Sequence, residues 1–235
     1  MQKENKITFS VFGRRALFTT PESKLGGEKF SYHIPTYESL VGMASSIYWK
    51  PTIQWIIDRV RIIQPIQTET VGTKLRRLDG KSDLAYYTYL RNVEYEVEAH
   101  FEWNLWRDDL SHDRNENKHF FMAQRSLEKG GRRDVFLGTR ECQGYAEPIE
   151  FGKQKGAYDQ TPELSYGLSF HSFSYPDQNE KGELIAHFWH PTMEYGIITF
   201  PKAEECSVRR VIKKGSKKEF VLGQNLRSVE EEVEV

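Results

Sequence analysis

The sequence predicts an α+β protein with a ferredoxin-like (RRM-like) βαββαβ core and a small antiparallel β extension after it. Two observations support this fold class. Across residues 1–151, the patterns follow in the order strand, helix, strand, strand, helix, strand, which is the ferredoxin-like order. From residue 152 onward, strand-like runs at 164–173, 184–189 and 195–200 come without a convincing helix. We therefore expect a ferredoxin-like domain over residues 1–151 and a β extension with a charged tail over residues 152–235.

The first half of the core combines a strand, a capped helix and a second strand. Residues 7–18 are rich in β-prone side chains. Thr36 is a suitable N-cap for a helix whose apolar residues recur at spacings of three and four. This helix should end near Trp49, because Lys50 precedes a proline and that position disfavours helical backbone. An alternating strand then runs to Pro65.

The second half of the core begins after a long connection. Residues 66–90 are polar and show no regular pattern, which predicts an irregular segment that is functional or mobile. Residues 93–103 alternate apolar and mostly acidic side chains, as in a strand with one buried and one wet face. Asn115 or Asn117 can cap a helix over residues 118–129, which Gly130 and Gly131 should end. A further strand starts at Val135 and resumes after glycine turns.

Composition favours a soluble, cytoplasmic protein. The 235 residues are 38% hydrophobic and 29% charged, as in an ordinary globular chain. No apolar run is long enough to span a bilayer, so no membrane partner is expected. The two cysteines, Cys142 and Cys206, have no metal-like spacing and are expected to be reduced thiols.

Charge is unevenly distributed along the chain, although the formal net charge is only −1. Basic residues gather in segments 118–140 and 209–218, and acidic residues gather at 94–98 and 230–234. A local basic face is sufficient for phosphate binding, whatever the sum over the whole chain. A run of charge is equally typical of a solvated surface.

Tyr48, Lys118 and His119 are the side chains best suited to chemistry on RNA. Cleavage without a metal needs a base for the 2′-hydroxyl, an acid for the departing 5′-oxygen, and positive charge beside the phosphate. Histidine can serve as acid or base near neutral pH, lysine supplies charge, and tyrosine can orient the nucleophile or act as a base. Lys118 and His119 also sit where a helix begins, and the free amides of a helix start favour an anion.

Each of these features also has a purely structural interpretation. A histidine at a helix start can be a cap or a surface residue, and Tyr48 can be a buried ring with a satisfied hydroxyl. The glycine-rich stretch after residue 129 can consist of ordinary turns. His187 and His190 have a spacing that could hold a metal, but no third ligand lies nearby in the sequence.

Taken together, several sequence blocks resemble the CRISPR-associated Cas-five family of subtype I-C. They are residues 12–19, 26–37, SIYWKP at 46–51, DRNE at 113–116 with the Lys118-His119 pair, and above all residues 124–145 with GGRRD at 130–134 and RECQGY at 140–145. The resemblance covers most of the chain, and it is tightest up to about residue 151. No single block would be specific, whereas the combination is.

The resemblance implies a function and a set of functional residues. Members of this branch of the RAMP superfamily have a ferredoxin-like core and cut the CRISPR repeat precursor RNA without a metal or other cofactor. The cut lies at the 3′ base of the repeat hairpin and leaves a 2′,3′-cyclic phosphate. The family's catalytic positions fall on Tyr48, Lys118 and His119. The expected RNA-binding residues are Arg125, Gly130, Gly131, Arg132, Arg133 and Arg140, with Lys74, Arg76 and Arg77 on a thumb-like hairpin within residues 66–90.

The resemblance also implies partners. The family stays bound to the 5′ handle of the mature guide RNA and joins Cas-seven and Cas-eight subunits in the type I-C surveillance complex. Three other functions remain open on the sequence alone. The chain can be a non-catalytic scaffold that caps the guide RNA, an interaction domain without an RNA role, or a metal-dependent nuclease that uses Asp108, Asp109 and Asp113.

Overall fold

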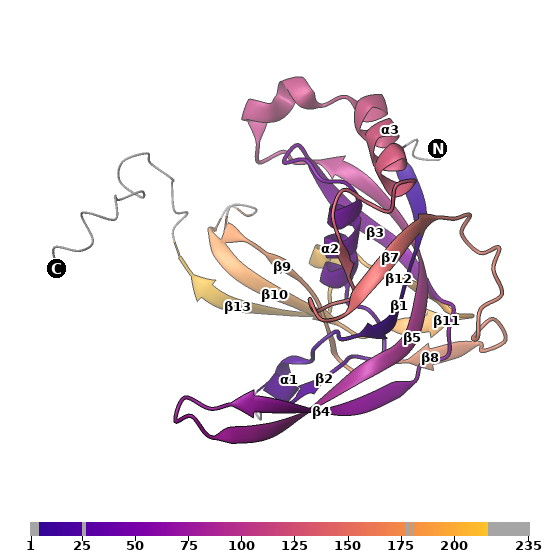
Figure 1. Cartoon of the computed structure of the whole chain (residues 1–235). Helices are drawn as coiled ribbons and strands as arrows, with labels where there is room; N and C mark the ends of the chain where they lie inside the picture. Colours follow the sequence, from indigo (N-terminus) through magenta and orange to yellow (C-terminus); the bar gives the residue numbers. More distant parts are fainter. Residues whose placement is uncertain (1–4, 25–26, 177–178, 180, 216–235) are drawn as a thin grey trace.

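The protein is a mixed α/β molecule built mostly of antiparallel strands with few helices (Figure 1). The computed structural model describes residues 5–24, 27–176, 179 and 181–215. The expected charged tail lies outside these residues, as do positions 216–218 of the second basic segment. In the part of the chain that the structure describes, no helix has the length and apolar character needed to cross a membrane.

The main sheet carries ten strands in the order β6-β7-β1-β5-β3-β12-β11-β8, with β2 and β4 also paired to β5. The strands of its central part are β1 (Lys6–Ala16), β3 (Ile53–Ile62), β5 (Ser82–Trp103), β6 (Val135–Phe136) and β7 (Gln143–Pro148). β5 pairs antiparallel with both β1 and β3. The alternation expected at residues 93–103 was correct only in part. Glu96, Glu98 and His100, expected on a wet face, are buried as well, and the two glutamates form ion pairs with arginines of β3. Val97, Ala99 and Phe101 on the opposite face are fully or almost fully buried, as predicted. This face joins the hydrophobic core.

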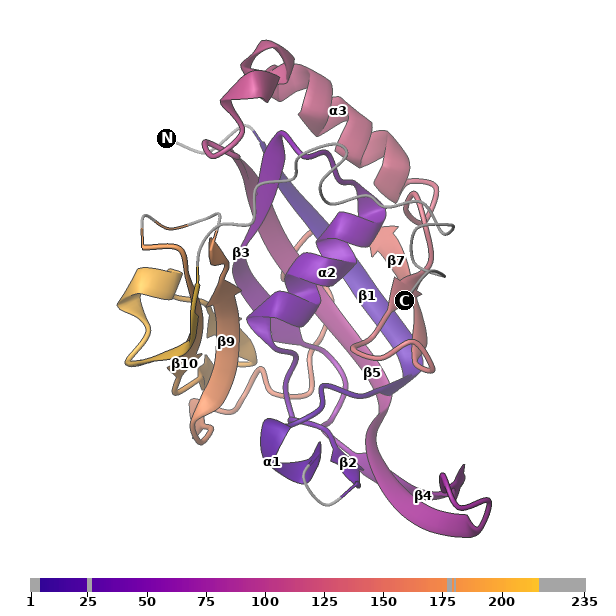
Figure 2. The same cartoon turned by 90° about the vertical axis from the view of Figure 1, so that its left-hand side faces the viewer.

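Two helices, α2 (Tyr37–Ile47) and α3 (Glu116–Leu127), accompany the sheet, and Figure 2 shows α2 lying across its strands. Thr36 caps α2 by accepting a hydrogen bond from the Ser39 amide, as predicted. α2 ends at Ile47, slightly before the expected stop. Asn115, rather than Asn117, caps α3 through the Lys118 amide. A short helix, α1 (Pro21–Lys24), precedes β2 (Lys29–Phe30).

The chain beyond residue 152 contributes to two sheets. β8 (Glu163–Ser165), β11 (Thr192–Glu194) and β12 (Ile197–Thr199) extend the main sheet, because β12 pairs with β3. β9 (Ser169–Ser174), β10 (Glu183–Trp189) and β13 (Val208–Lys214) form a separate three-stranded sheet whose β9 lies against α2. Short 3-10 turns, η1 (Asp108–Asp113) and η3 (Ala203–Glu205), complete the described elements.

The expectation of an irregular connection at residues 66–90 was wrong. β4 (Thr68–Arg76) pairs with the first half of β5 in a long hairpin that projects from the body of the protein (Figures 1 and 2). Most of β4 is exposed, and Leu78 at its tip is fully exposed. Because both faces of this ribbon are largely wet, its sequence lacks the apolar alternation that identifies a half-buried strand. The two cysteines are unpaired and buried.

Candidate active site and RNA interface

Tyr48 occupies the position immediately after α2, where the chain leaves the helix. Its backbone is extended, and its amide still bonds the Ala44 carbonyl. The Trp55 indole donates a hydrogen bond of 2.7 Å to the Tyr48 carbonyl, which fixes the turn against β3. The Tyr48 ring is only 4% exposed.

His119, in the first turn of α3, is completely buried. Its ring lies edge-on against Phe101 and Trp103 of β5. The Tyr48 hydroxyl is 2.8 Å from His119 Nδ1, although the two residues are 71 positions apart in the sequence. On the other side of the ring, Nε2 lies 2.9 Å from the Asp113 carbonyl oxygen. A carbonyl can only accept, so Nε2 carries a hydrogen, and Nδ1 of the neutral ring accepts from the tyrosine.

Asp113 links the two catalytic candidates of α3. Its carboxylate forms an ion pair with the Lys118 ammonium, accepts a hydrogen bond of 2.7 Å from the Thr52 hydroxyl, and lies 3.4 Å from His119 Nε2. The hydrogen bonds from Lys118 and Thr52 lower the pKa of Asp113 to about 2. The Lys118 side chain is half exposed. Lys118 is therefore the member of the trio most open to solvent.

The Tyr48 hydroxyl remains protonated over the physiological range. Burial, with a smaller contribution from the Asp113 charge, raises the pKa of Tyr48 to about 12. The hydroxyl consequently donates to His119 Nδ1. Tyrosinate is not available as an independent base near neutral pH, because its formation would place a second negative charge close to Asp113.

A cavity of about 320 Å³ opens beside Tyr48 and is bordered by Trp49, Met122, Arg125 and Arg132. The Arg132 guanidinium lies 5.7 Å from the centre of the Trp49 ring, a cation–π geometry that leaves the charge near the cavity mouth. The cavity is thus bordered by one tyrosine and two arginines, which is the kind of surface that accepts a phosphodiester.

The glycine loop after α3 packs against the end of α2. Gly130 and Gly131 have φ values of +81° and +109°. A Cβ on Gly131 would come within 3.3 Å of the Ser46 carbonyl oxygen, so glycine is required for this close approach. The Arg132 amide then bonds the carbonyls of Ser46 and Ile47. These bonds cap α2 and direct the arginine toward the cavity.

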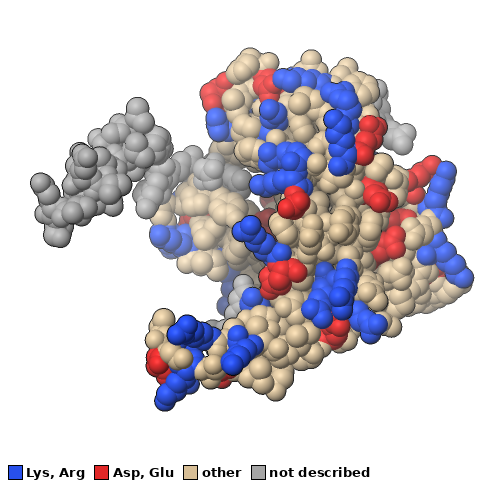
Figure 3. All heavy atoms as spheres, in the orientation of Figure 1, with Lys and Arg blue, Asp and Glu red and all other residues tan. Residues whose placement is uncertain are grey.

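The other predicted RNA-binding residues are exposed but lie apart from the trio. Arg133 and Arg140 are exposed near the glycine loop, and the hairpin cations Lys74, Arg76 and Arg77 are exposed near the tip of β4. Figure 3 shows basic side chains on one face, both over the α3 region and on the hairpin. The structure therefore brings together Tyr48, Lys118 and His119, with Arg125 and Arg132 nearby, and leaves the hairpin cations at a distance.

The aspartates of the metal-dependent alternative are individually paired with cations. Asp108 pairs with Arg114, Asp109 pairs with Arg107, and Asp113 pairs with Lys118. Among the described residues, no group of three histidine, cysteine, aspartate or glutamate side chains is arranged to hold a metal ion.

Sequence reasoning missed two parts of this region. Thr52 was not identified, and Asp113 was considered only as a metal ligand. The position of Asp113, five residues before a lysine at the start of a helix, is the sequence feature that could have indicated its role.

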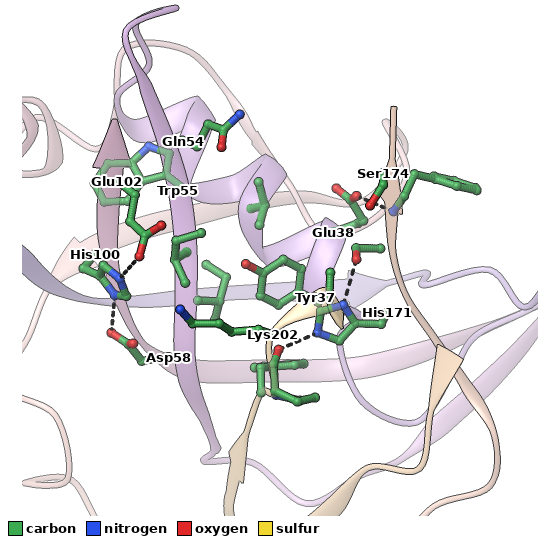
Figure 4. Close-up of a pocket in the computed structure, with 18 of the residues that line it drawn as sticks. Tyr37, Glu38, Gln54, Trp55, Asp58, His100, Glu102, His171, Ser174 and Lys202 are labelled. Carbon is green, nitrogen blue, oxygen red and sulfur yellow. Dashed lines mark hydrogen bonds and ion pairs between the residues drawn. The ribbon is translucent and has the colours of Figure 1, made fainter. Parts of the chain in front are cut away.

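A groove of about 830 Å³ between α2, β3 and β9 was also missed (Figure 4). Asp58 and Glu102 lie on either side of His100 along its floor.

Comparisons with known proteins agree on one family. A family model described as CRISPR-associated protein (Cas_Cas5), the Cas5d model, matches residues 6–201. The CRISPR pre-crRNA endoribonuclease Cas5d of Mannheimia succiniciproducens is 27% identical, over 88% of this chain and 99% of that protein. The protein of the same name from Thermus thermophilus is 24% identical, over 83% and 91%.

A solved structure described as a CRISPR-associated protein has a TM-score of 0.74 to this chain at 37% identity. The superposition covers 88% of this chain and 96% of that one. Similarity thus extends over nearly the whole length of the relatives in both sequence and fold. This chain belongs to the Cas5d family of CRISPR-associated proteins.

Proposed function

We propose that this protein is the metal-independent endoribonuclease of a subtype I-C CRISPR system, which cuts the repeat precursor RNA at the 3′ base of the repeat hairpin. The names of the two curated relatives support endoribonuclease activity on precursor CRISPR RNA. The sheet contains the strand order β7-β1-β5-β3. Along the chain, α2 lies between β1 and β3, and α3 lies between β5 and β7. This arrangement supports a ferredoxin-like core for this enzyme.

The observation that carries the proposal is the contact between the Tyr48 hydroxyl and His119 Nδ1 at 2.8 Å. It joins the end of one helix to the start of another, next to a lysine and beside a cavity bordered by Arg125 and Arg132. A tyrosine that only filled core space would have no need of a titratable partner, a lysine and two arginines around it.

The three residues differ in burial and therefore have different roles in the proposed reaction. His119 is fully buried, so it acts through Tyr48, whose ring borders the cavity. As the ribose 2′-hydroxyl attacks phosphorus, its proton passes to the Tyr48 oxygen while the Tyr48 proton passes to His119 Nδ1. The new 2′-oxygen–phosphorus bond replaces the bond to the 5′-oxygen, which takes a proton from water. The hydroxide that remains is neutralised by the proton that His119 returns through Tyr48. The products are a 2′,3′-cyclic phosphate and a 5′-hydroxyl.

Lys118 and Asp113 support this transfer. The Lys118 ammonium offsets the additional negative charge on the pentacoordinate phosphorus. The Asp113 carboxylate, 3.4 Å from His119 Nε2, stabilises the imidazolium that forms when Nδ1 accepts its proton. RNA must compete with Asp113 for Lys118, since the ion pair occupies the ammonium in this structure.

After cleavage, the protein is proposed to retain the 5′ handle of the guide RNA and to join Cas-seven and Cas-eight subunits in the surveillance complex. The arginines of the glycine loop and the hairpin cations supply positive charge on one face (Figure 3), as retention of a phosphate backbone requires. A protein that keeps its product turns over once, so single-turnover kinetics are expected.

The test is incubation of the protein with its cognate repeat RNA in excess chelator. A parallel substrate carries a 2′-deoxy nucleotide at the scissile position. The proposal predicts cleavage of the first RNA and none of the second. His119→Ala should retain RNA binding and lose cleavage. Binding without cleavage by the unmodified protein would instead support the non-catalytic scaffold, and loss of activity with chelator would support the metal-dependent alternative.

A further inference from the structure

The groove of about 830 Å³ between α2, β3 and β9 contains none of the proposed catalytic side chains. In Figure 4, Asp58, His100 and Glu102 lie on one side, Glu38 and Ser174 lie on the other, and Tyr37 and Lys202 lie between them. Its volume is within the range of sites that bind a defined ligand. Its walls come from segments far apart in the sequence, so the groove depends on the complete fold.

The floor of this groove is a strand edge. β12 pairs with β3 at Arg59–Arg61, and the Asp58 carbonyl accepts a further hydrogen bond from the Phe200 amide. No strand of the described residues pairs with positions 53–57 on the side away from β5. The Thr52 carbonyl accepts from the Asn104 amide, toward β5, so the backbone groups of alternate positions 53, 55 and 57 face the groove. The hydrogen bond between the Tyr37 hydroxyl and the Ile57 backbone agrees with this direction.

A strand edge of this kind favours the binding of an extended polypeptide. The N–H and C=O groups of Trp55 face the groove without a strand partner among the described residues, and buried backbone groups tend to be paired. The five residues 53–57 span about 17 Å, enough for a short ladder with a peptide. The edge is also recessed, since Trp55 is only 3% exposed. This position prevents nonspecific pairing with the sheet edges of other proteins.

The charged and aromatic side chains of the groove indicate which kind of peptide it binds. The described lining includes five carboxylates, from Glu38, Asp58, Glu102, Glu204 and Glu205, and two cations, from Arg59 and Lys202. Arg59 is already bonded to Glu98, and Asp58 and Glu102 both contact His100, so the carboxylates still outnumber the cations of the lining. At the rim, Trp106 and Tyr175 are nearly half exposed, and exposed rings stack well on arginine. This charge repels a phosphate backbone and attracts a basic segment.

We propose that this groove binds an extended, arginine- or lysine-bearing segment of a partner protein, which adds a strand to β3 beside β12. The inference goes beyond the proposed RNA cleavage and does not depend on it. The segment forms backbone hydrogen bonds centred on Trp55, because the Ile57 backbone already bonds the Tyr37 hydroxyl and the Ile53 amide bonds the Lys50 carbonyl. Its basic side chains reach Glu102 on one side and Glu38 on the other. Docking here leaves the basic face over α3 and the hairpin free for RNA.

The test places the photo-cross-linker p-benzoylphenylalanine at Gln54, which lines the groove. The variant is assembled with guide RNA and the proteins that copurify with this chain, irradiated, and analysed by mass spectrometry. The expected product is a cross-link to one protein segment that contains arginine or lysine. The same cross-linker at exposed Lys153, outside the groove, should not give this product. Trp106 provides a second cross-linking position at the rim, in case the Gln54 variant does not fold.

Charge reversal completes the test. Glu102→Lys should reduce the cross-linked product at least tenfold and leave RNA cleavage unchanged, whereas Glu163→Lys, an exposed carboxylate of β8 outside the groove, should leave both unchanged. Cross-linking to RNA, to a second copy of this chain, or to nothing in the purified assembly would overturn the proposal. Insensitivity to Glu102→Lys would overturn it as well. Failure of RNA cleavage alone would contradict the proposed function and leave the docking site intact.

Discussion

Replacing Tyr48 by phenylalanine removes a single hydroxyl and keeps the ring. In the folded protein, His119 Nδ1 would then be buried without its partner at 2.8 Å. Leaving a buried acceptor unsatisfied costs about 1–3 kcal/mol of the free energy of unfolding. For a chain of this length, each kcal/mol lowers the melting temperature by about 2–4 °C. The protein should therefore remain folded at 25 °C.

The effect on RNA cleavage should be much larger than the effect on stability. Proton transfer by a positioned side chain contributes about 10²–10⁴-fold to a rate. If Tyr48 passes the 2′-hydroxyl proton to His119, Tyr48→Phe loses this factor, because Tyr48 is the partner of His119 Nδ1 and borders the cavity. The single-turnover rate constant, measured with protein in excess over end-labelled repeat RNA, should fall at least 100-fold. RNA affinity should change less than threefold.

Tyr37→Phe is the matched control. Tyr37 is partly buried, and its hydroxyl is hydrogen-bonded to the Ile57 backbone, but it lies in the groove and not beside the cavity of Tyr48. It should show a comparable loss of stability with unchanged cleavage. The relay through Tyr48 would be refuted if Tyr48→Phe cut RNA within threefold of the unmodified protein while His119→Ala was inactive.

Three further predictions concern binding, backbone strain and pH. Alanine at all three hairpin cations should weaken binding of the 5′ handle and reduce the slope of log affinity against log salt by about 0.7 for each phosphate that the hairpin no longer neutralises, as measured by filter binding. Gly138→Ala should destabilise the protein by roughly 2–4 kcal/mol in urea titrations, because Gly138 has φ +95° and an added Cβ would lie 2.1 Å from the Leu17 carbonyl oxygen. As a control, Gly42→Ala should stabilise the protein by roughly 0.5–1 kcal/mol, because an added Cβ at this position of α2 meets open space. Burial lowers the pKa of His171 to about 4, so the unfolded chain binds more protons below pH 6.5, and stability should fall by about 2 kcal/mol between pH 7.5 and 5. His171→Gln should flatten this dependence, and an unchanged slope would contradict the assignment.

The elements with a one-sided apolar pattern were predictable from the sequence. α2 and α3 were identified by their caps and spacing, and the buried half of β5 was identified by its alternation. The hairpin of β4 and β5 was expected only from the resemblance. Its residue pattern did not indicate strands, because the hairpin lies largely outside the core and so lacks hydrophobic periodicity. The three-stranded sheet of β9, β10 and β13 was expected only as short strands, since their pairing depends on contacts between distant segments.

The identities of the candidate catalytic residues came from sequence, but their arrangement did not. Tyr48 and the Lys118-His119 pair could be named from a resemblance between motifs. No pattern in the sequence indicated that His119 would be fully buried with both ring nitrogens engaged. That arrangement depends on the wall of Phe101 and Trp103 and on the turn that brings Asp113 under the ring. For this reason the sequence left the acid and base roles open, whereas the burial of His119 supports the proposed relay through Tyr48.

The length of β5 has a mechanical consequence. One strand of 22 residues begins near the tip of the hairpin and ends with the rings that enclose His119, and Asn92, with φ +49°, marks the irregular point along it. Fully extended, it would span at most about 75 Å. Under the proposed function, the backbone of β5 sets the distance between RNA bound at the hairpin and the candidate catalytic residues. Shortening β5 by two residues would preserve the side-chain alternation and shift the register of the cut.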